Sequence, residues 1–277
     1  MLDTARAVAA DLKLPVVNCP TVASSDAPCS ALSVIYTDDG AFLQYRIYGK
    51  NPDLVLVDTQ VIAQSPPRLL VAGMGDALAT WFEANTCVQG NVKNMRGGGS
   101  SQSALALAEL CYRILLRDGV GAVAALQNRF STPALERLVE ANTLLSGLGF
   151  ESSGLAAAHA VHNGLTAVPQ THPYFHGEKV AYGLLVQLIL EKKTQSLMEE
   201  VLDFATTVGL PTTLAAIGLA EMTDEMLEQI AARSTAKGET IHNEPFAVQP
   251  RTVAEAICAA DSLGREWQRK HDVATEH

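Results

Sequence analysis

Four of the seven histidines lie within residues 151–179, and three of them have a spacing that could hold a metal ion. His159 and His162 are three residues apart on a predicted helix, so their side chains project from neighbouring faces. His176 follows beyond a loop, where another helix is predicted to begin. Imidazoles arranged in this way can gather round a divalent cation. The alternative is that the helical histidines only make hydrogen bonds within the fold.

A carboxylate ligand is also expected, because imidazoles alone would leave the charge of a metal ion unbalanced. Asp76 is the best candidate, since Gly73 and Gly75 leave backbone space beside its carboxylate. We predict that Asp76 lies in the first turn of a helix. The alternative is that the Asp76 carboxylate binds no metal and only interacts favourably with the helix dipole.

A polar loop of small residues, 20–33, follows a predicted strand. In open α/β sheets, ligands bind beyond the carboxyl ends of the strands, so this position favours ligand binding. The loop supplies hydroxyl groups and one carboxylate, on Thr21, Ser24, Ser25, Asp26 and Ser30. The alternative is a plain connecting loop without a ligand, which would have the same composition.

The glycine run at residues 97–99 looks like a phosphate-binding loop but has the wrong context. A dinucleotide-binding loop follows a strand in a βαβ unit, whereas this run lies between two predicted helices. We therefore predict a linker, with Ser100 or Ser101 as the N-cap of the next helix.

The elements that position these residues divide the chain into two predicted domains, 1–66 and 67–277. The first begins with a helix whose buried face is predicted to carry Leu2, Ala5, Ala9 and Leu12. Strands are predicted at residues 14–20, 31–36, 42–47 and 54–58, the first and last fully buried and the middle two forming a hairpin with a turn at 37–40. From residue 69 onward the periodicity is helical.

The composition excludes several classes of protein. The 277 residues are 48% hydrophobic, which argues against a disordered acidic chain, and the net charge of −10 argues against binding to nucleic acid. No apolar run is long enough to span a membrane. The charged residues Asp3, Arg6 and Asp11 interrupt any signal peptide, so we expect a cytoplasmic protein.

Three long segments resemble bacterial glycerol dehydrogenases, of the iron-containing or group III alcohol dehydrogenase superfamily. They are residues 20–40, residues 73–84, and residues 152–164 together with 176–183. The resemblance implies a dehydroquinate synthase-like fold, in which an N-terminal α/β nucleotide-binding domain precedes a large all-α domain. It also implies an active site between the two domains, and a homo-oligomer formed through the helical domains.

The implied reaction is the oxidation of glycerol, or a similar small diol, to dihydroxyacetone by NAD with zinc as a Lewis acid. The residues that match the family's metal ligands are Asp76, His159 and His176. Asp26 matches a residue that contacts the substrate, and His162 matches a histidine near the nicotinamide that could pass on the released proton. The implied contacts to the nicotinamide cofactor are Thr21, Ser24, Ser30, Leu32 and Tyr36.

One departure from the family is large. Its members begin with a further segment that holds the first strands, the acid for the adenosine ribose and the pyrophosphate loop. This sequence starts with a helix followed by a strand, as if in the middle of a βαβ unit. We therefore expect an incomplete NAD site and little turnover by the chain alone. The alternatives are an inactive metal-binding homologue and a related dehydrogenase of vicinal diols or hydroxyketones.

Overall fold

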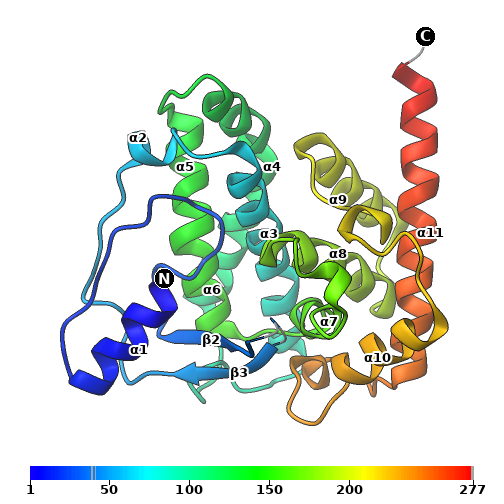
Figure 1. Cartoon of the computed structure of the whole chain (residues 1–277), viewed down its shortest axis with the longest axis horizontal. Coiled ribbons are helices and arrows are strands. Elements are labelled where there is room, and N and C mark those ends of the chain that lie inside the picture. The colour runs from blue at the N-terminus through cyan, green and yellow to red at the C-terminus, as the bar shows by residue number, and fades with distance from the viewer. Residues whose placement is uncertain (39, 41, 276–277) are drawn as a thin grey trace.

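The computed structural model describes residues 1–38, 40 and 42–275. Figure 1 shows a small α/β part at the N-terminus beside a larger helical part. Among the described residues, the strands all lie before residue 56, and the chain is helical from α3 onward. This arrangement confirms the predicted fold class. The predicted turn at residues 37–40 includes Asp39, which lies outside the described residues.

The strands form two separate pairs. Strands β2 (Leu32–Tyr36) and β3 (Phe42–Ile47) pair antiparallel, which confirms the predicted hairpin. Strands β1 (Val17–Asn18) and β4 (Leu54–Val55) pair in parallel, although they are distant in the sequence.

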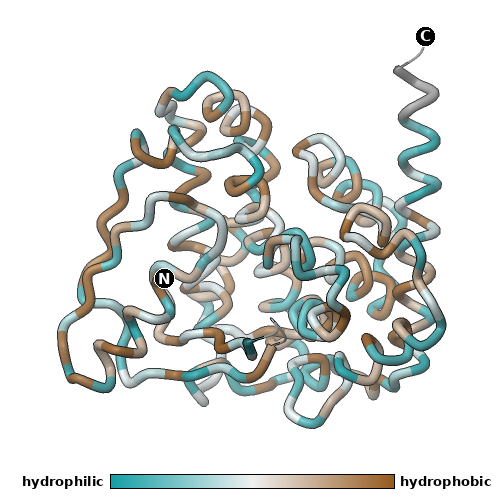
Figure 2. The backbone as a smooth tube through the Cα atoms, in the orientation of Figure 1, coloured by the Kyte–Doolittle hydropathy of each residue, from teal (hydrophilic) through white to brown (hydrophobic). Residues whose placement is uncertain are grey.

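The prediction that residues 14–20 and 54–58 form fully buried strands is wrong. Val17, Leu54 and Leu56 are 57%, 51% and 59% exposed, and both strands are only two residues long. Among the described residues, β1 and β4 pair only with each other, so little of the chain covers their side chains. Figure 2 shows hydrophobic residues along the edge of the molecule where β1 and β4 lie.

Helix α1 (Leu2–Leu12) forms where predicted, but a different face of it is buried. Arg6 and Ala9 are buried, whereas Leu12 is exposed. The guanidinium group of Arg6 donates to the carbonyl oxygen and the hydroxyl group of Ser30, just before β2. These hydrogen bonds turn a polar face of α1 toward β2, which the pattern of apolar residues did not indicate.

The remaining helices build the larger part of the molecule. The α-helices are α2 (Thr59–Ile62), α3 (Pro67–Gln89), α4 (Gln102–Gln127), α5 (Pro133–Glu140), α6 (Ser146–Ser153), α7 (Ala157–Leu165), α8 (His176–Leu190), α9 (Gln195–Val208), α10 (Asp224–Ser234) and α11 (Pro250–Thr275). The short turns of other helix types are η1 (Ala141–Leu145), η2 (Pro169–Thr171), η3 (Ala215–Ile217) and η4 (Thr240–Asn243). In the described part of the chain, every helix is too short or too polar to cross a membrane.

The prediction that Asp76 lies in the first turn of a helix is wrong, because α3 begins nine residues earlier, at Pro67. Proline suits the first position of a helix, where its missing N–H group has no intrahelical partner to lose. Asp76 therefore lies in the helix interior and is fully buried. An interaction with the helix dipole does not explain a buried acid at this position.

Helices α3, α7 and α8 lie at the centre of the helical part. Helix α3 packs against α4, α6 and α8, and α7 packs against α8 and α10. Leu70, Met74 and Leu78 of α3 are almost wholly buried, as is Tyr182 of α8. The Tyr182 hydroxyl group donates to the carbonyl oxygen of Ile257 at 2.8 Å, which ties α8 to α11.

Candidate metal centre

The side chains of Asp76, His159 and His176 meet where α3, α7 and α8 come together. Asp76 Oδ1 lies 3.3 Å from His159 Nε2 and 3.2 Å from His176 Nε2. One ligand atom from each residue lies within 4.8 Å of the other two. Asp76 and His159 are buried, while the His176 side chain is 28% exposed. The group is therefore open to solvent on the His176 side.

Two glycines next to these ligands allow α3 and α8 to approach closely. A Cβ atom on Gly177 would lie 1.7 Å from the carbonyl oxygen of Ala72, and one on Gly75 would lie 2.3 Å from that of Gly177. Both distances are far below van der Waals contact, so only glycine fits here. Because Gly75 precedes Asp76 and Gly177 follows His176, this contact brings the two ligands together.

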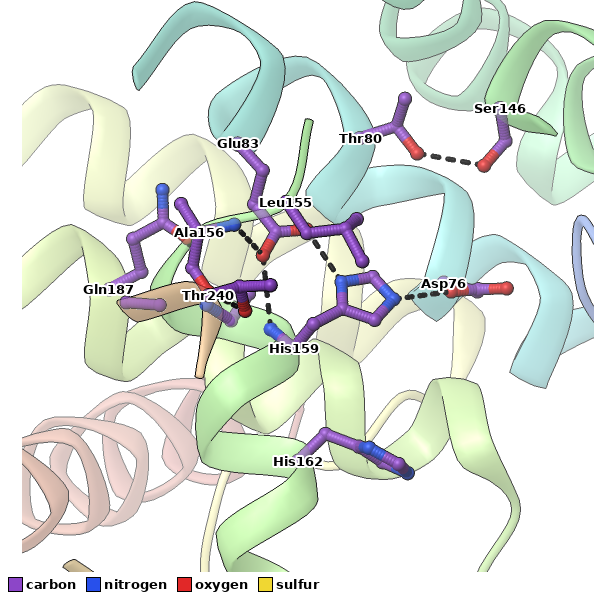
Figure 3. A network of polar contacts seen from close by, with 12 residues as sticks. Asp76, Thr80, Glu83, Ser146, Leu155, Ala156, His159, His162, Gln187 and Thr240 are labelled. Carbon is purple, nitrogen blue, oxygen red and sulfur yellow. Dashed lines mark hydrogen bonds and ion pairs between the residues drawn. The ribbon is translucent and has the colours of Figure 1, made fainter. Parts of the chain in front are cut away.

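Glu83 holds the ring of His159 from the other side, as Figure 3 shows. Glu83 Oε2 lies 2.6 Å from His159 Nδ1, and Oε1 accepts from the backbone N–H groups of Ala156 and His159. Nδ1 of His159 donates to the Glu83 carboxylate, so Nε2 is the ring nitrogen that would present its lone pair to a cation bound beside Asp76. A carboxylate in this position is common behind metal-bound histidines.

The same end of α7 is capped by side chains from distant parts of the chain. The N–H group of Ala157 donates to Glu244 Oε1 at 3.2 Å, and that of Ala158 donates to Gln187 Oε1 at 2.9 Å. Together with Glu83, these residues satisfy the free N–H groups at the start of the helix. The cap fixes the position of the turn that carries His159.

Asp26 reaches the site from the polar loop, and His162 reaches it from α7. The N–H group of Asp26 donates to Asp76 Oδ2 at 3.2 Å, and Asp26 Oδ2 accepts from Ser146 at 2.9 Å. His162 is buried, with Nε2 3.0 Å from Nδ1 of His176. Both residues thus touch predicted metal ligands.

The five residues predicted to contact the cofactor have diverse surroundings. Ser30 and Leu32 are buried, Ser24 is half-buried, and Thr21 and Tyr36 are exposed. They follow the loop from β1 to the end of β2. Contact with a nicotinamide remains a prediction for them.

The buried acids and histidines of the site shift one another's pKa values. Burial and the nearby Asp76 carboxylate raise the pKa of Asp26 well above its ordinary value. Burial opposes ionisation of Asp76 as well, but His176 and His159 outweigh it and hold the Asp76 pKa below its ordinary value. Burial likewise disfavours a charged His159, yet Glu83 and Asp76 raise its pKa well above the ordinary value. A cation among these groups would relieve the repulsion between the acids.

The donor set fits a divalent cation such as zinc. Catalytic zinc sites commonly use three protein ligands drawn from histidine and carboxylate, with a further position left open. Two ligands bound at about 2.0–2.1 Å in tetrahedral geometry lie about 3.3 Å apart. The separations from Asp76 Oδ1 to His159 Nε2 and His176 Nε2 are 3.3 and 3.2 Å. The residues present therefore match the size of such a site.

Known proteins are similar in sequence to this chain over nearly its whole length. A family model described as iron-containing alcohol dehydrogenase matches residues 1–66. A glycerol dehydrogenase from Thermotoga maritima is 59% identical over 264 residues, which cover 95% of this chain and 72% of the relative. The chain belongs to the iron-containing alcohol dehydrogenase family. A glycerol dehydrogenase from Citrobacter freundii is 55% identical, covering 96% of this chain and 73% of that relative.

Solved structures of this family share the fold. The crystal structure of glycerol dehydrogenase from Schizosaccharomyces pombe superposes with a TM-score of 0.96 at 42% identity. The match covers 98% of this chain and 69% of that one. The small α/β part followed by a large helical domain is therefore a feature of the family.

Several residues of the site were not predicted from the sequence. Glu83 follows Asp76 by seven residues, two helical turns, so the spacing does place both acids on one face of α3. Glu244 comes from a distant loop, and no local pattern connects it to α7. The glycine run at residues 97–99 lies between α3 and α4, and Ser101 caps α4, as predicted.

Proposed function

We propose that this chain carries the metal centre of a glycerol dehydrogenase, which oxidises glycerol or a similar vicinal diol with NAD. The observation that carries the proposal is the convergence of Asp76, His159 and His176 in a chain 59% identical to a glycerol dehydrogenase. We assign residues 1–66 to the remaining part of an NAD-binding α/β domain, with an incomplete NAD site, and residues 67–277 to the metal-binding catalytic domain. We also expect a homo-oligomer.

The chain's own residues would hold the cation and orient the substrate. Asp76, His159 and His176 supply one negative charge and two neutral nitrogen ligands. A bound zinc ion would act as a Lewis acid toward a substrate hydroxyl group and make its proton easier to lose. Asp26 lies beside Asp76, where its carboxyl group can hydrogen-bond a second hydroxyl group and so select a diol. Residues of the 21–36 loop would hold the nicotinamide of NAD, which would supply the acceptor for a hydride from the substrate.

Binding of the substrate can be tested separately from turnover. The visible absorption of Co²⁺ bound in place of zinc reports on changes close to the metal. Glycerol should perturb this spectrum, and 1-propanol at the same concentration should not. Asp26→Asn should weaken the glycerol response roughly 2- to 10-fold, because a hydrogen bond contributes about 0.5–1.5 kcal/mol. Asp53→Asn, at an exposed acid paired with Lys50, is the matched control.

Turnover is measured as glycerol-dependent formation of NADH, followed at 340 nm. NADH formation that is faster with glycerol than with other vicinal diols supports the proposed substrate. A faster reaction with another diol or a hydroxyketone would identify the related dehydrogenase instead. Glycerol binding without NADH formation would identify a metal-binding homologue without turnover.

A further inference from the structure

Beyond His176, a line of hydrogen bonds leads from the candidate metal centre to the protein surface. His176 Nδ1 lies 3.0 Å from His162 Nε2, and His162 Nδ1 lies 3.1 Å from Asn163 Oδ1. Asn163 Nδ2 donates to Glu239 Oε2 at 2.9 Å, and the other oxygen of Glu239 pairs with Arg233. The line thus joins α8 and α7 to η4 and α10.

The inner members of this line are closed off from solvent. His162 and Asn163 are each 1% exposed and Glu239 is 8% exposed, whereas the side chain of Arg233 is 27% exposed. The hairpin covers part of this line, because the Arg233 guanidinium group lies over the ring of Phe42 and the Tyr45 hydroxyl group lies 3.5 Å from Asn163 Nδ2. Water is therefore a poor competitor for these hydrogen bonds.

The charged outer end determines the direction of each hydrogen bond. The Arg233 guanidinium group can only donate, and the Glu239 carboxylate with which it pairs can only accept. Asn163 must therefore turn its NH₂ group to Glu239 and its carbonyl oxygen to His162. That oxygen requires a proton on Nδ1 of His162, which leaves Nε2 as an acceptor.

The same logic continues to the metal centre. Because His162 Nε2 accepts, Nδ1 of His176 must carry a proton, and the lone pair of His176 Nε2 is left for a positive charge beside Asp76. We infer that Asn163 and Glu239 are positioning residues, which set the tautomers of His162 and His176 so that His176 Nε2 can bind a cation. This inference rests on the proposed metal centre.

The arrangement gives His162 a different role from the predicted proton transfer. Both of its ring nitrogens are occupied, and the next group outward is an amide, which has no titratable proton to pass on. The line therefore transmits orientation rather than protons. Glu83 does the same for His159 from the opposite side of the site.

The test reads the histidine tautomers directly, by ¹⁵N NMR of histidine-labelled chain with and without Zn²⁺. His162 should carry its proton on Nδ1 in both states. Asn163→Ala should remove this preference and weaken Zn²⁺ binding, measured by chelator competition, roughly 10- to 100-fold. Asn163→Asp keeps an acceptor toward His162 and should retain the tautomer. Asn128→Ala, at the exposed end of α4, is the matched control.

A proton on Nε2 of His162 in the parent chain would overturn the inference. So would an unchanged tautomer and unchanged Zn²⁺ affinity in a folded Asn163→Ala variant. If that variant does not fold, Glu239→Gln provides the same measurement, because its amide can present an NH₂ group to Asn163 and reverse the line. A parent chain that binds no Zn²⁺ would refute the metal centre, while the NMR spectra would still decide the direction of the hydrogen bonds.

Discussion

The α/β part and the helical part of this chain bury their apolar residues to very different extents. Leu70 and Leu78 of α3 are at most 1% exposed, whereas Leu54 of β4 and Leu56 next to it are more than half exposed. Apolar side chains are thus enclosed by packed helices in one part, while those at β4 remain on the surface in the other. The helical part has a closed core of its own, and the strands β1 and β4 do not.

Polar groups show the same contrast. The three candidate metal ligands all come from the helical part, where Glu83 and His162 hold the two histidine rings. The α/β part contributes Asp26 through a loop that contacts α3. The candidate metal centre therefore depends on the helical core, while the loop of the α/β part adds groups at its edge.

Removal of a candidate ligand from the helical core should have the largest effect. His176→Ala should weaken Zn²⁺ binding roughly a thousandfold, or about 4 kcal/mol, because one of three protein ligands is lost. Chelator competition measures the affinity. His242→Ala, at an exposed histidine far from the site in sequence, should bind zinc like the parent chain. Unchanged binding by His176→Ala would exclude His176 as a ligand.

Truncation of a leucine in each part tests the difference in burial. Leu78→Ala should lower the free energy of unfolding by about 2–5 kcal/mol, because it leaves a cavity in the core. Leu56→Ala should change it by about 0.5 kcal/mol or less, since more than half of this side chain is already exposed. Urea unfolding measures both. Equal losses in the two variants would show that the α/β part has a core comparable to that of the helical part.

The stability of the helical part should also depend on pH through Glu244. Burial and the neighbouring Glu191 raise the pKa of Glu244 to about 8, compared with an ordinary value of 4.5, and Glu83 adds to this effect. The folded chain then holds this proton more tightly than the unfolded chain. Its contribution to stability is complete below pH 4.5 and is lost as the pH rises toward 8.

Glu244→Gln should therefore lose less stability than the parent chain between pH 5 and pH 8. The two chains should differ in this loss of unfolding free energy by on the order of 1–3 kcal/mol, because one pKa unit corresponds to about 1.4 kcal/mol. Urea unfolding of metal-free protein at both pH values measures it. Glu255→Gln, at an exposed acid of α11, should keep the pH dependence of the parent chain.

The smallest effect on stability is expected from polar substitutions on the exposed strand surface. Leu54→Ser combined with Leu56→Ser should reduce self-association while changing the stability of the helical part by less than about 0.5 kcal/mol. Light scattering at micromolar concentration measures the mass of the particles. A monomeric parent chain would contradict the predicted self-association.

The residue types and spacing in the sequence proposed Asp76 and three histidines as candidate ligands. The resemblance to glycerol dehydrogenases chose His159 and His176 among the histidines, and the structure brings these two together with Asp76. The hairpin and the change to a helical chain were also predictable, because their patterns are local. The start of α3 was misplaced, because the glycines around Asp76 suggested a turn where their role is close helix packing.

The fold class and the chemistry of the candidate ligands follow from residue types and local periodicity, and the family follows from the resemblance of long segments to known proteins. Which groups support the ligands depends on the tertiary structure. Glu83, Glu244 and Asn163 act on the site through hydrogen bonds to segments distant in the chain, and their partners have no fixed sequence separation. The burial of β1 and β4 was likewise decided by the neighbours present in three dimensions, because an apolar run shows only that a strand can be buried.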